Sequence, residues 1–155
     1  MVDAPHDLLS ATDFAPFRAL ADMPAAMTAH VVFAALDPDA PATTSPAVIV
    51  AIVRGEIGFD GLLVSDDLSM AALDGAVGAR AAAALGAGCD VVLHCNGEMA
   101  EMTAVAAACA PLSAAAALRA GRALARPGDP LPCDACEVDA VRLAAYLEQE
   151  SRHAV

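Results

Sequence analysis

A short apolar run followed at once by two carboxylates constrains the fold of this chain more than any other feature. Residues 62–64, Leu-Leu-Val, follow a Gly-Phe-Asp-Gly turn and precede Ser65, Asp66 and Asp67. A run that is apolar on both faces is typical of a strand buried in a parallel sheet. The carboxyl ends of such strands carry the chemistry in parallel α/β folds, so the two aspartates lie where a site is expected.

The rest of the chain alternates apolar runs with helical patterns. Residues 25–33 are apolar except for Thr28 and His30, and residues 90–95 form a third run. Helical patterns occupy residues 12–20, 47–54, 79–87, 98–110 and 113–126, with a short helical turn expected at 68–73. This order predicts three parallel strands, near 26–32, 62–65 and 90–93, lying side by side in chain order.

Helix boundaries and the domain boundary follow from capping and turn residues. Ser45 and Pro46 suit the start of one helix, Gly88 stops another, and Ser113 caps a third. The Pro-Gly-Asp-Pro stretch at 127–130 predicts a boundary between a domain at 1–126 and a tail at 127–155. Within the tail, residues 137–149 have helical spacing.

Composition excludes several classes of protein. The formal net charge is −12, and all eight cationic side chains are arginine. Nucleic-acid binding needs clustered cations, which this chain lacks. No stretch of ~18 uninterrupted apolar residues predicts a membrane-spanning helix, and residues 1–20 lack the pattern of a signal peptide. Five cysteines without framework spacing favour a reducing cytoplasm.

The segment 58–70 closely resembles the nucleophile motif of glycoside hydrolase family 3, in the form seen in bacterial β-N-acetylhexosaminidases. The resemblance extends over roughly residues 2–125, through the segments 13–18, 24–31, 36–38, 45–46, 54–55 and 88–93. It implies a (β/α)8 TIM-type barrel, which needs roughly 200 to 250 residues. We therefore expect an α/β fold that is a partial barrel, about its last three strands with their helices, and the C-terminal part of a longer enzyme.

The resemblance also implies roles for site residues. Asp66 matches the catalytic nucleophile, whereas Asp67 points to the other side of the strand and is expected to support the following turn. His30, Met70 and Asn96 are candidate substrate-binding residues beside Asp66. Each has an alternative structural role: His30 and Asn96 as hydrogen-bonded residues, Met70 as a core residue.

Other chemical motifs point to structure rather than to a site. His94 ends the last strand and is interpreted as structural, and the His6-Asp7 pair as surface. Cys133 and Cys136 form a single C-x-x-C, too few ligands for zinc and outside the strand context of a redox motif. We expect no metal and no cofactor.

The resemblance implies removal of terminal β-N-acetylglucosamine from peptidoglycan-derived muropeptides by a retaining mechanism, in the bacterial cytoplasm. The family's histidine–aspartate acid/base loop and its contacts to the sugar precede the matched region, so we expect them to be missing. The expected partners are the glycan and either the missing N-terminal barrel half or a second copy of the chain. The alternative is a non-catalytic remnant, or a half-barrel that works only with a partner chain supplying the N-terminal strands.

Overall fold

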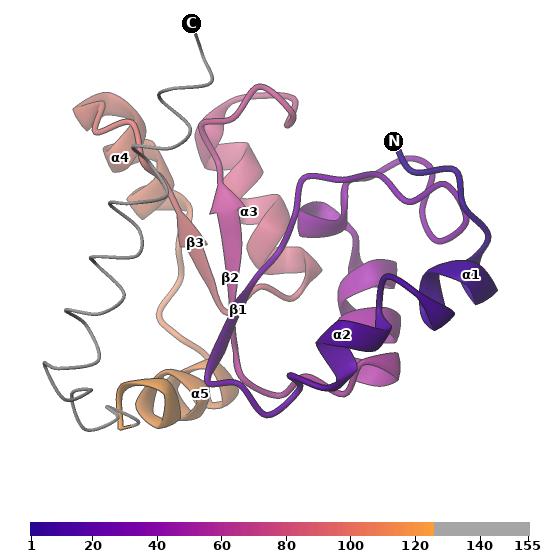
Figure 1. The fold of residues 1–155 in the computed structure, drawn as a ribbon. Coiled ribbons are helices and arrows are strands. Elements are labelled where there is room, and N and C mark those ends of the chain that lie inside the picture. Colours follow the sequence, from indigo (N-terminus) through magenta and orange to yellow (C-terminus); the bar gives the residue numbers. More distant parts are fainter. Residues whose placement is uncertain (126–155) are drawn as a thin grey trace, which may run out of the picture.

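The computed structural model describes residues 1–125 as an α/β domain built around a three-stranded parallel sheet (Figure 1). The strands are β1 (Ala25–Met27), β2 (Leu62–Asp67) and β3 (Val91–Leu93), in the order β1-β2-β3. The prediction of three parallel strands in chain order is confirmed. The C-x-x-C motif and the helix expected at 137–149 lie outside the described residues.

The first strand is shorter than the sequence predicted. β1 pairs with β2 from Ala25 to Met27 rather than over residues 26–32. Beyond Thr28 the backbone leaves β2 and pairs with the start of the chain, where Val2 forms a parallel bridge with Phe33. The second half of the apolar run therefore belongs to a different pairing. By contrast, β2 continues past residue 65 and includes both Asp66 and Asp67.

The single helix predicted at 12–20 is wrong. The structure has two short helices there, α1 (His6–Ala11) and α2 (Ala15–Arg18). Thr12 ends α1 instead of starting a helix, and Pro16 stands in the first turn of α2. Since proline has no backbone N–H, it fits a first turn but cannot continue a helix from the preceding residues.

Four of the remaining helices lie close to their predicted positions: η2 (Ala47–Glu56), α3 (Val77–Ala87), α4 (Met99–Ala108) and α5 (Ala114–Leu124). The short helix η1 (Ala42–Thr44) was not predicted, because the sequence indicated a loop there. η2 has the wide turn of a π-helix, closed by a bond from the N–H of Ile57 to the carbonyl of Ile52, and Ser45 Oγ accepts the N–H of Val48. Ser113 caps α5 as predicted. Residues 68–73 form turns and no helix.

Gly88 ends α3 for two reasons. Its φ is +119°, a left-handed conformation that glycine adopts without steric cost. A Cβ at this position would also lie 2.9 Å from Cγ2 of Ile49. The glycine therefore lets α3 turn sharply into β3 while η2 packs close beside it.

Two buried clusters hold the elements together. One joins the sheet to η2 and α3 through Leu63, Ile49 and Ala84, and the other joins α1 and α2 to η2 through Leu9 and Phe14. Leu63 therefore faces the helices. The register between β2 and β3 shifts between Val64 and Asp67, so the two aspartates follow an irregularity in the strand. Within residues 1–125, no helix is long and apolar enough to cross a membrane.

The amino ends of the strands are fixed by one buried carboxylate. Asp90, whose side chain is 6% exposed, accepts hydrogen bonds from Arg54 at 2.8 Å and from Arg119 at 3.0 Å. It also accepts the backbone N–H of Leu63 at 2.9 Å. This ion pair joins η2, β2, β3 and α5 at the end of the sheet opposite to Asp66.

Candidate active site

Asp66 stands at the carboxyl end of β2 with most of its carboxylate unused. Its Oδ1 accepts one hydrogen bond, from the N–H of Asp67 at 2.8 Å. Within residues 1–125 no other hydrogen bond reaches this carboxylate, and no cation pairs with it. A half-buried carboxylate with free lone pairs at a strand end can act as a nucleophile or a base.

Asp67, in contrast, is fully engaged by the protein. Its carboxylate accepts the hydroxyl of Ser69 at 2.5 Å, the N–H of Ser69 at 3.0 Å and the N–H of Cys95 at 3.1 Å. These hydrogen bonds, those of Ser69 first, lower the pKa of Asp67. The prediction that Asp67 supports the turn after β2 is confirmed, and the carboxylate also ties that turn to the end of β3.

His30 is brought to the same edge of the sheet as Asp66. Its Nε2 lies 2.9 Å from the carbonyl oxygen of Asp67, and its Nδ1 lies 2.8 Å from Oγ1 of Thr43. Both ring nitrogens thus have partners in the protein, which is the alternative role of holding a neighbouring segment. Contact with a substrate stays a prediction, and it would use the carbon edge of the ring.

Thr28 and Thr43 complete the surroundings of Asp66, and sequence reasoning missed both. Thr28 Oγ1 accepts the N–H of Asp66 at 3.3 Å and lies 2.8 Å from Oγ1 of Thr43. Thr43 is fully buried. The one available signal was that Thr28, like His30, is a polar position in an apolar run. No local signal marks Thr43, because its contact depends on how the loop of residues 34–46 folds back.

Met70 lies on the turn after β2 and is 44% exposed. The turn is held by Arg80, whose guanidinium donates to the carbonyl oxygens of Leu68 at 2.7 Å, Met70 at 3.0 Å and Gly75 at 2.9 Å. The side chain of Met70 is therefore exposed at the rim of the site, the edge of the sheet where the strands end, rather than packed in the core. Its contact with a substrate stays a prediction.

Asn96 directly follows Cys95, whose N–H reaches the Asp67 carboxylate, so it lies at the same edge of the sheet as that aspartate. Its side-chain amide donates to Glu101 at 2.5 Å, and its Oδ1 accepts the N–H of Glu98 at 2.9 Å. The side chain thereby holds the loop that leads into α4. It is exposed, so it remains a candidate for binding.

His94 is buried without a hydrogen bond to either ring nitrogen in the described part of the chain. Its side chain is 6% exposed, and Nε2 lies 3.4 Å from Oε2 of Glu101. It also contributes to lowering the pKa of Asp67. Because it is buried directly after β3, we interpret it as structural, as the sequence indicated.

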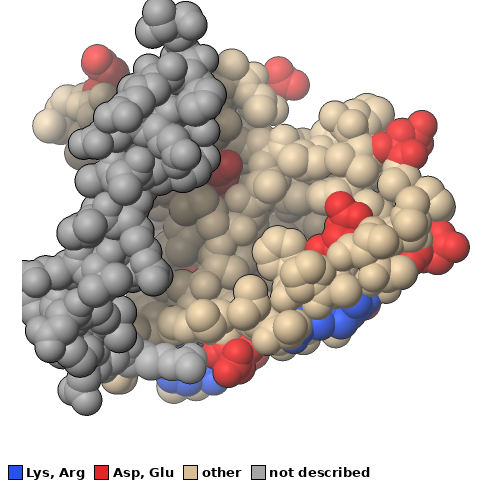
Figure 2. Space-filling model, viewed as in Figure 1, with Lys and Arg blue, Asp and Glu red and all other residues tan. Residues whose placement is uncertain are grey.

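On the face of the molecule seen in Figure 2, the arginine side chains lie apart from the acidic side chain inside the hollow. Figure 2 shows a hollowed face with arginine side chains along its lower edge only, and an acidic side chain inside the hollow. In residues 1–125, no group of three or more histidine, cysteine, aspartate or glutamate side chains is arranged to hold a metal ion. The chemistry that the described site offers is that of one accessible carboxylate.

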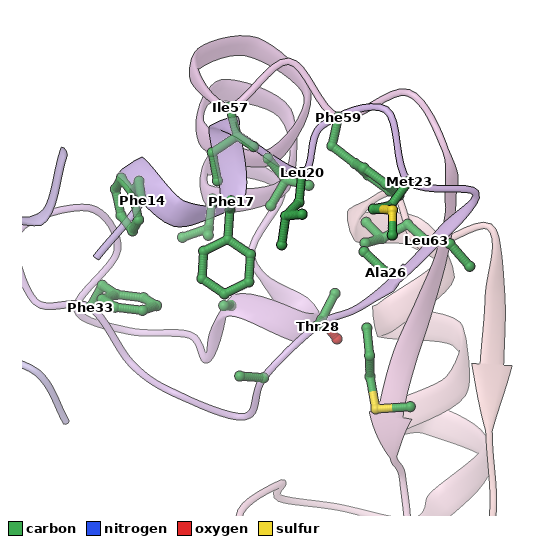
Figure 3. A pocket seen from close by; sticks show the side chains of 16 residues that line it. Phe14, Phe17, Leu20, Met23, Ala26, Thr28, Phe33, Ile57, Phe59 and Leu63 are labelled. Carbon is green, nitrogen blue, oxygen red and sulfur yellow. The ribbon is translucent and has the colours of Figure 1, made fainter. Parts of the chain in front are cut away.

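An apolar groove of about 370 Å³ lies beside the outer edge of β1. Figure 3 shows Phe17 and Leu20 pointing into it from α2 and the segment that follows, with Phe33 and Ala26 on its other sides. Phe17 is 59% exposed and Met27, on β1, is 56% exposed. Sugar sites need convergent polar groups, so this groove has the character of a packing surface.

Comparison with known proteins gives one consistent family. The model of the glycosyl hydrolase family 3 N-terminal domain matches residues 1–121. A β-hexosaminidase of Alkalilimnicola ehrlichii is 50% identical over 92 residues, 57% of this chain and 26% of that protein. A β-hexosaminidase of Chromobacterium violaceum is 50% identical over 106 residues, 64% of this chain and 28% of that protein.

Solved structures agree with the sequence comparison. NagZ from Neisseria gonorrhoeae, determined in complex with N-trifluoroacetyl-D-glucosamine, superposes with a TM-score of 0.69 and 36% identity, over 79% of this chain and 36% of that one. A family 3 β-N-acetylglucosaminidase from Paenibacillus superposes with a TM-score of 0.65 and 33% identity, over 80% and 26%. The chain thus spans between a quarter and a third of the length of these two curated relatives.

Proposed function

Because the chain belongs to glycosyl hydrolase family 3, matched over residues 1–121, we propose that it supplies the nucleophile of a retaining β-N-acetylhexosaminidase. The observation that carries this proposal is the contrast between two adjacent carboxylates. The carboxylate of Asp67 is held by three hydrogen bonds, whereas that of Asp66 accepts one. Asp66 is the group that is free to attack.

The proposed reaction has two displacement steps. The Asp66 carboxylate attacks the anomeric carbon of a terminal β-N-acetylglucosamine, forming an ester bond as the glycosidic C–O bond breaks, and the leaving oxygen takes a proton from an acid. Water then attacks the same carbon, losing its proton to that group acting as a base, and releases Asp66. By similarity to NagZ, we further propose peptidoglycan-derived muropeptides as substrates and the cytoplasm as the location.

In residues 1–125, neither imidazole at this end of the sheet is placed to act as the acid/base group. That of His30 has both nitrogens engaged, and that of His94 is buried, with a side chain 6% exposed. General acid–base help contributes roughly 10² to 10⁴-fold to such reactions. We therefore propose that the acid/base loop and the contacts to the 2-acetamido sugar belong to the part of the relatives that this chain does not span.

The apolar groove beside β1 and the outer edge of this strand, which is unpaired within residues 1–125, support the proposal that the chain is part of a barrel. We propose that β1 to β3 are the last three strands of a (β/α)8 barrel, whose preceding strand would pair with the free edge of β1. The N-terminal part of the barrel, which contains that preceding strand, would also cover the exposed side chains of Phe17, Leu20 and Met27. Without that cover, edge strands and apolar faces promote self-association, which we expect for the purified chain.

The test is reconstitution with an aryl β-N-acetylglucosaminide as substrate. The chain is assayed alone and mixed with the N-terminal segment of the Alkalilimnicola relative, which is 50% identical in the matched region. We expect little or no turnover alone and measurable turnover in the mixture. Absence of turnover in a mixture that forms a complex would favour a non-catalytic remnant.

A further inference from the structure

One set of side chains binds the backbone of Asp66 and Asp67, at the N–H of Asp66 and at the carbonyl oxygen of Asp67. On one side, the N–H of Asp66 donates to Oγ1 of Thr28 at 3.3 Å. On the other, the carbonyl oxygen of Asp67 lies 2.9 Å from Nε2 of His30. Thr43 connects the two sides, at 2.8 Å from Thr28 Oγ1 and 2.8 Å from His30 Nδ1. We refer to Thr28, Thr43 and His30 as the threonine–histidine clamp.

The direction of every hydrogen bond in the clamp follows from its ends. A carbonyl oxygen only accepts, so His30 Nε2 carries a proton and, in the neutral ring, Nδ1 is an acceptor. Thr43 must then donate its single hydroxyl proton to Nδ1, and it accepts from Thr28. Thr28 in turn donates its single hydroxyl proton to Oγ1 of Thr43, and its own Oγ1 accepts the N–H of Asp66. Each hydroxyl then donates one hydrogen bond, while the neighbouring thiol of Cys89 donates to the carbonyl oxygen of Thr43 at 3.8 Å.

This direction has a consequence for the Asp66 carboxylate. The hydroxyl of Thr28 is hydrogen-bonded to the backbone of Asp66, yet its proton is committed to Thr43. It is therefore not available to the carboxylate. Hydrogen bonds donated to a carboxylate stabilise its charge, so withholding one keeps Asp66 the more reactive of the two aspartates.

Resting on the proposed function of Asp66, we propose that Thr28, Thr43 and His30 are positioning residues for this nucleophile. They fix the backbone on both sides of the Asp66–Asp67 peptide and keep the Thr28 hydroxyl proton away from the carboxylate. Thr43 is fully buried and comes from η1, so the clamp ties the loop before η2 directly to the site. A displacement of about 1 Å in a reacting group costs up to ~10²-fold in rate.

The test compares three substitutions in η1. Thr43→Val keeps the shape and removes the hydroxyl, Thr43→Ser restores the hydroxyl, and Thr44→Val removes a neighbouring hydroxyl that donates to the carbonyl of Pro41. The first readout is nitrogen NMR of the reconstituted mixture, in which only the 155-residue chain carries the nitrogen label. We expect His30 in the Nε2–H form with a hydrogen-bonded Nδ1, and loss of the Nδ1 signature in Thr43→Val but not in Thr43→Ser or Thr44→Val.

The second readout is the rate at which a 5-fluoro N-acetylglucosaminyl fluoride esterifies Asp66 in the reconstituted mixture. Fluoride leaves without a proton, so this rate reports the nucleophile alone. We expect the labelling rate of Thr43→Val at saturating probe to fall roughly 10-fold or more. The probe concentration that gives half of the maximal rate should not change. We expect recovery in Thr43→Ser and a normal rate in Thr44→Val.

The outcomes separate the clamp from the proposed function. His30 carrying its proton on Nδ1 in the unmodified chain would overturn the clamp, even if Thr43→Val failed to fold. Equal labelling of Thr43→Val and the unmodified protein would also overturn it. Absence of label on Asp66 in the unmodified mixture would instead contradict the proposed nucleophile, and the NMR result would still decide whether the clamp exists.

Discussion

Replacing Asp90 should destabilise the fold more than replacing any exposed acidic residue. In Asp90→Ala, the N–H of Leu63 loses its acceptor in a strand where Leu63 itself is 1% exposed. Arg54 and Arg119 lose their shared carboxylate at the same time. The damage is concentrated where η2, β2, β3 and α5 meet.

The size of the effect can be worked from these contacts. An unpaired buried N–H costs about 1–3 kcal/mol, and breaking a buried ion pair costs about 3–5 kcal/mol. The guanidiniums are 18% and 21% exposed, and Arg54 keeps the carbonyl oxygens of Phe59 and Gly61 as acceptors. We therefore expect a total of about 4 kcal/mol, the sum of the lower ends of these two ranges. For a chain of this length that is a fall in Tm of roughly 10 °C.

The assay is unfolding by heat and by urea, followed by far-ultraviolet circular dichroism. Asp90→Asn keeps an acceptor for the Leu63 N–H and should lose about half as much. The matched control is Asp60→Ala, which removes a carboxylate that also pairs with Arg119 but is 66% exposed, where ion pairs contribute little. Equal losses for Asp90→Ala and Asp60→Ala would refute the assignment of stability to the buried carboxylate.

Two further predictions follow from perturbed groups away from the rim. Hydrogen bonds from Ser10 and His6 hold the pKa of Glu56 at about 2, below its unfolded value of 4.5. The stability that Glu56 contributes is therefore present above pH 4.5 and is lost as the pH falls toward 2. Glu56→Gln should flatten the dependence of Tm on pH in this window, and an unchanged slope would contradict this. Burial raises the pKa of the Cys89 thiol to about 11, so maleimide at about pH 8 should modify the exposed Cys95 well before Cys89, as measured by peptide mapping; comparable rates would show that Cys89 is accessible.

The sequence predicted those features that depend on neighbouring residues. The apolar runs located all three strands, the Ser113 cap located the start of α5, and Gly88 located the end of α3. The position of Asp66 and Asp67 at a strand end followed from the same local pattern. Such signals act over a few residues, which is why they can be read without the structure.

Features that depend on distant contacts were not predicted. The early end of β1 follows from the pairing of Val2 with Phe33, and a run of apolar residues gives no sign of which partner it will choose. The engagement of both nitrogens of His30 depends on Thr43 and on the backbone of Asp67. Those partners are 13 and 37 residues away in the chain, beyond the reach of any local motif.

The most direct test of the account is to identify the residue that becomes covalently bound to sugar. The chain, mixed with the N-terminal segment of a curated relative, is treated with the 5-fluoro N-acetylglucosaminyl fluoride, digested and analysed by mass spectrometry. We expect one 5-fluoro-N-acetylglucosaminyl adduct on Asp66, absent in Asp66→Asn. An adduct on Asp67, or a label that persists in Asp66→Asn, would contradict it.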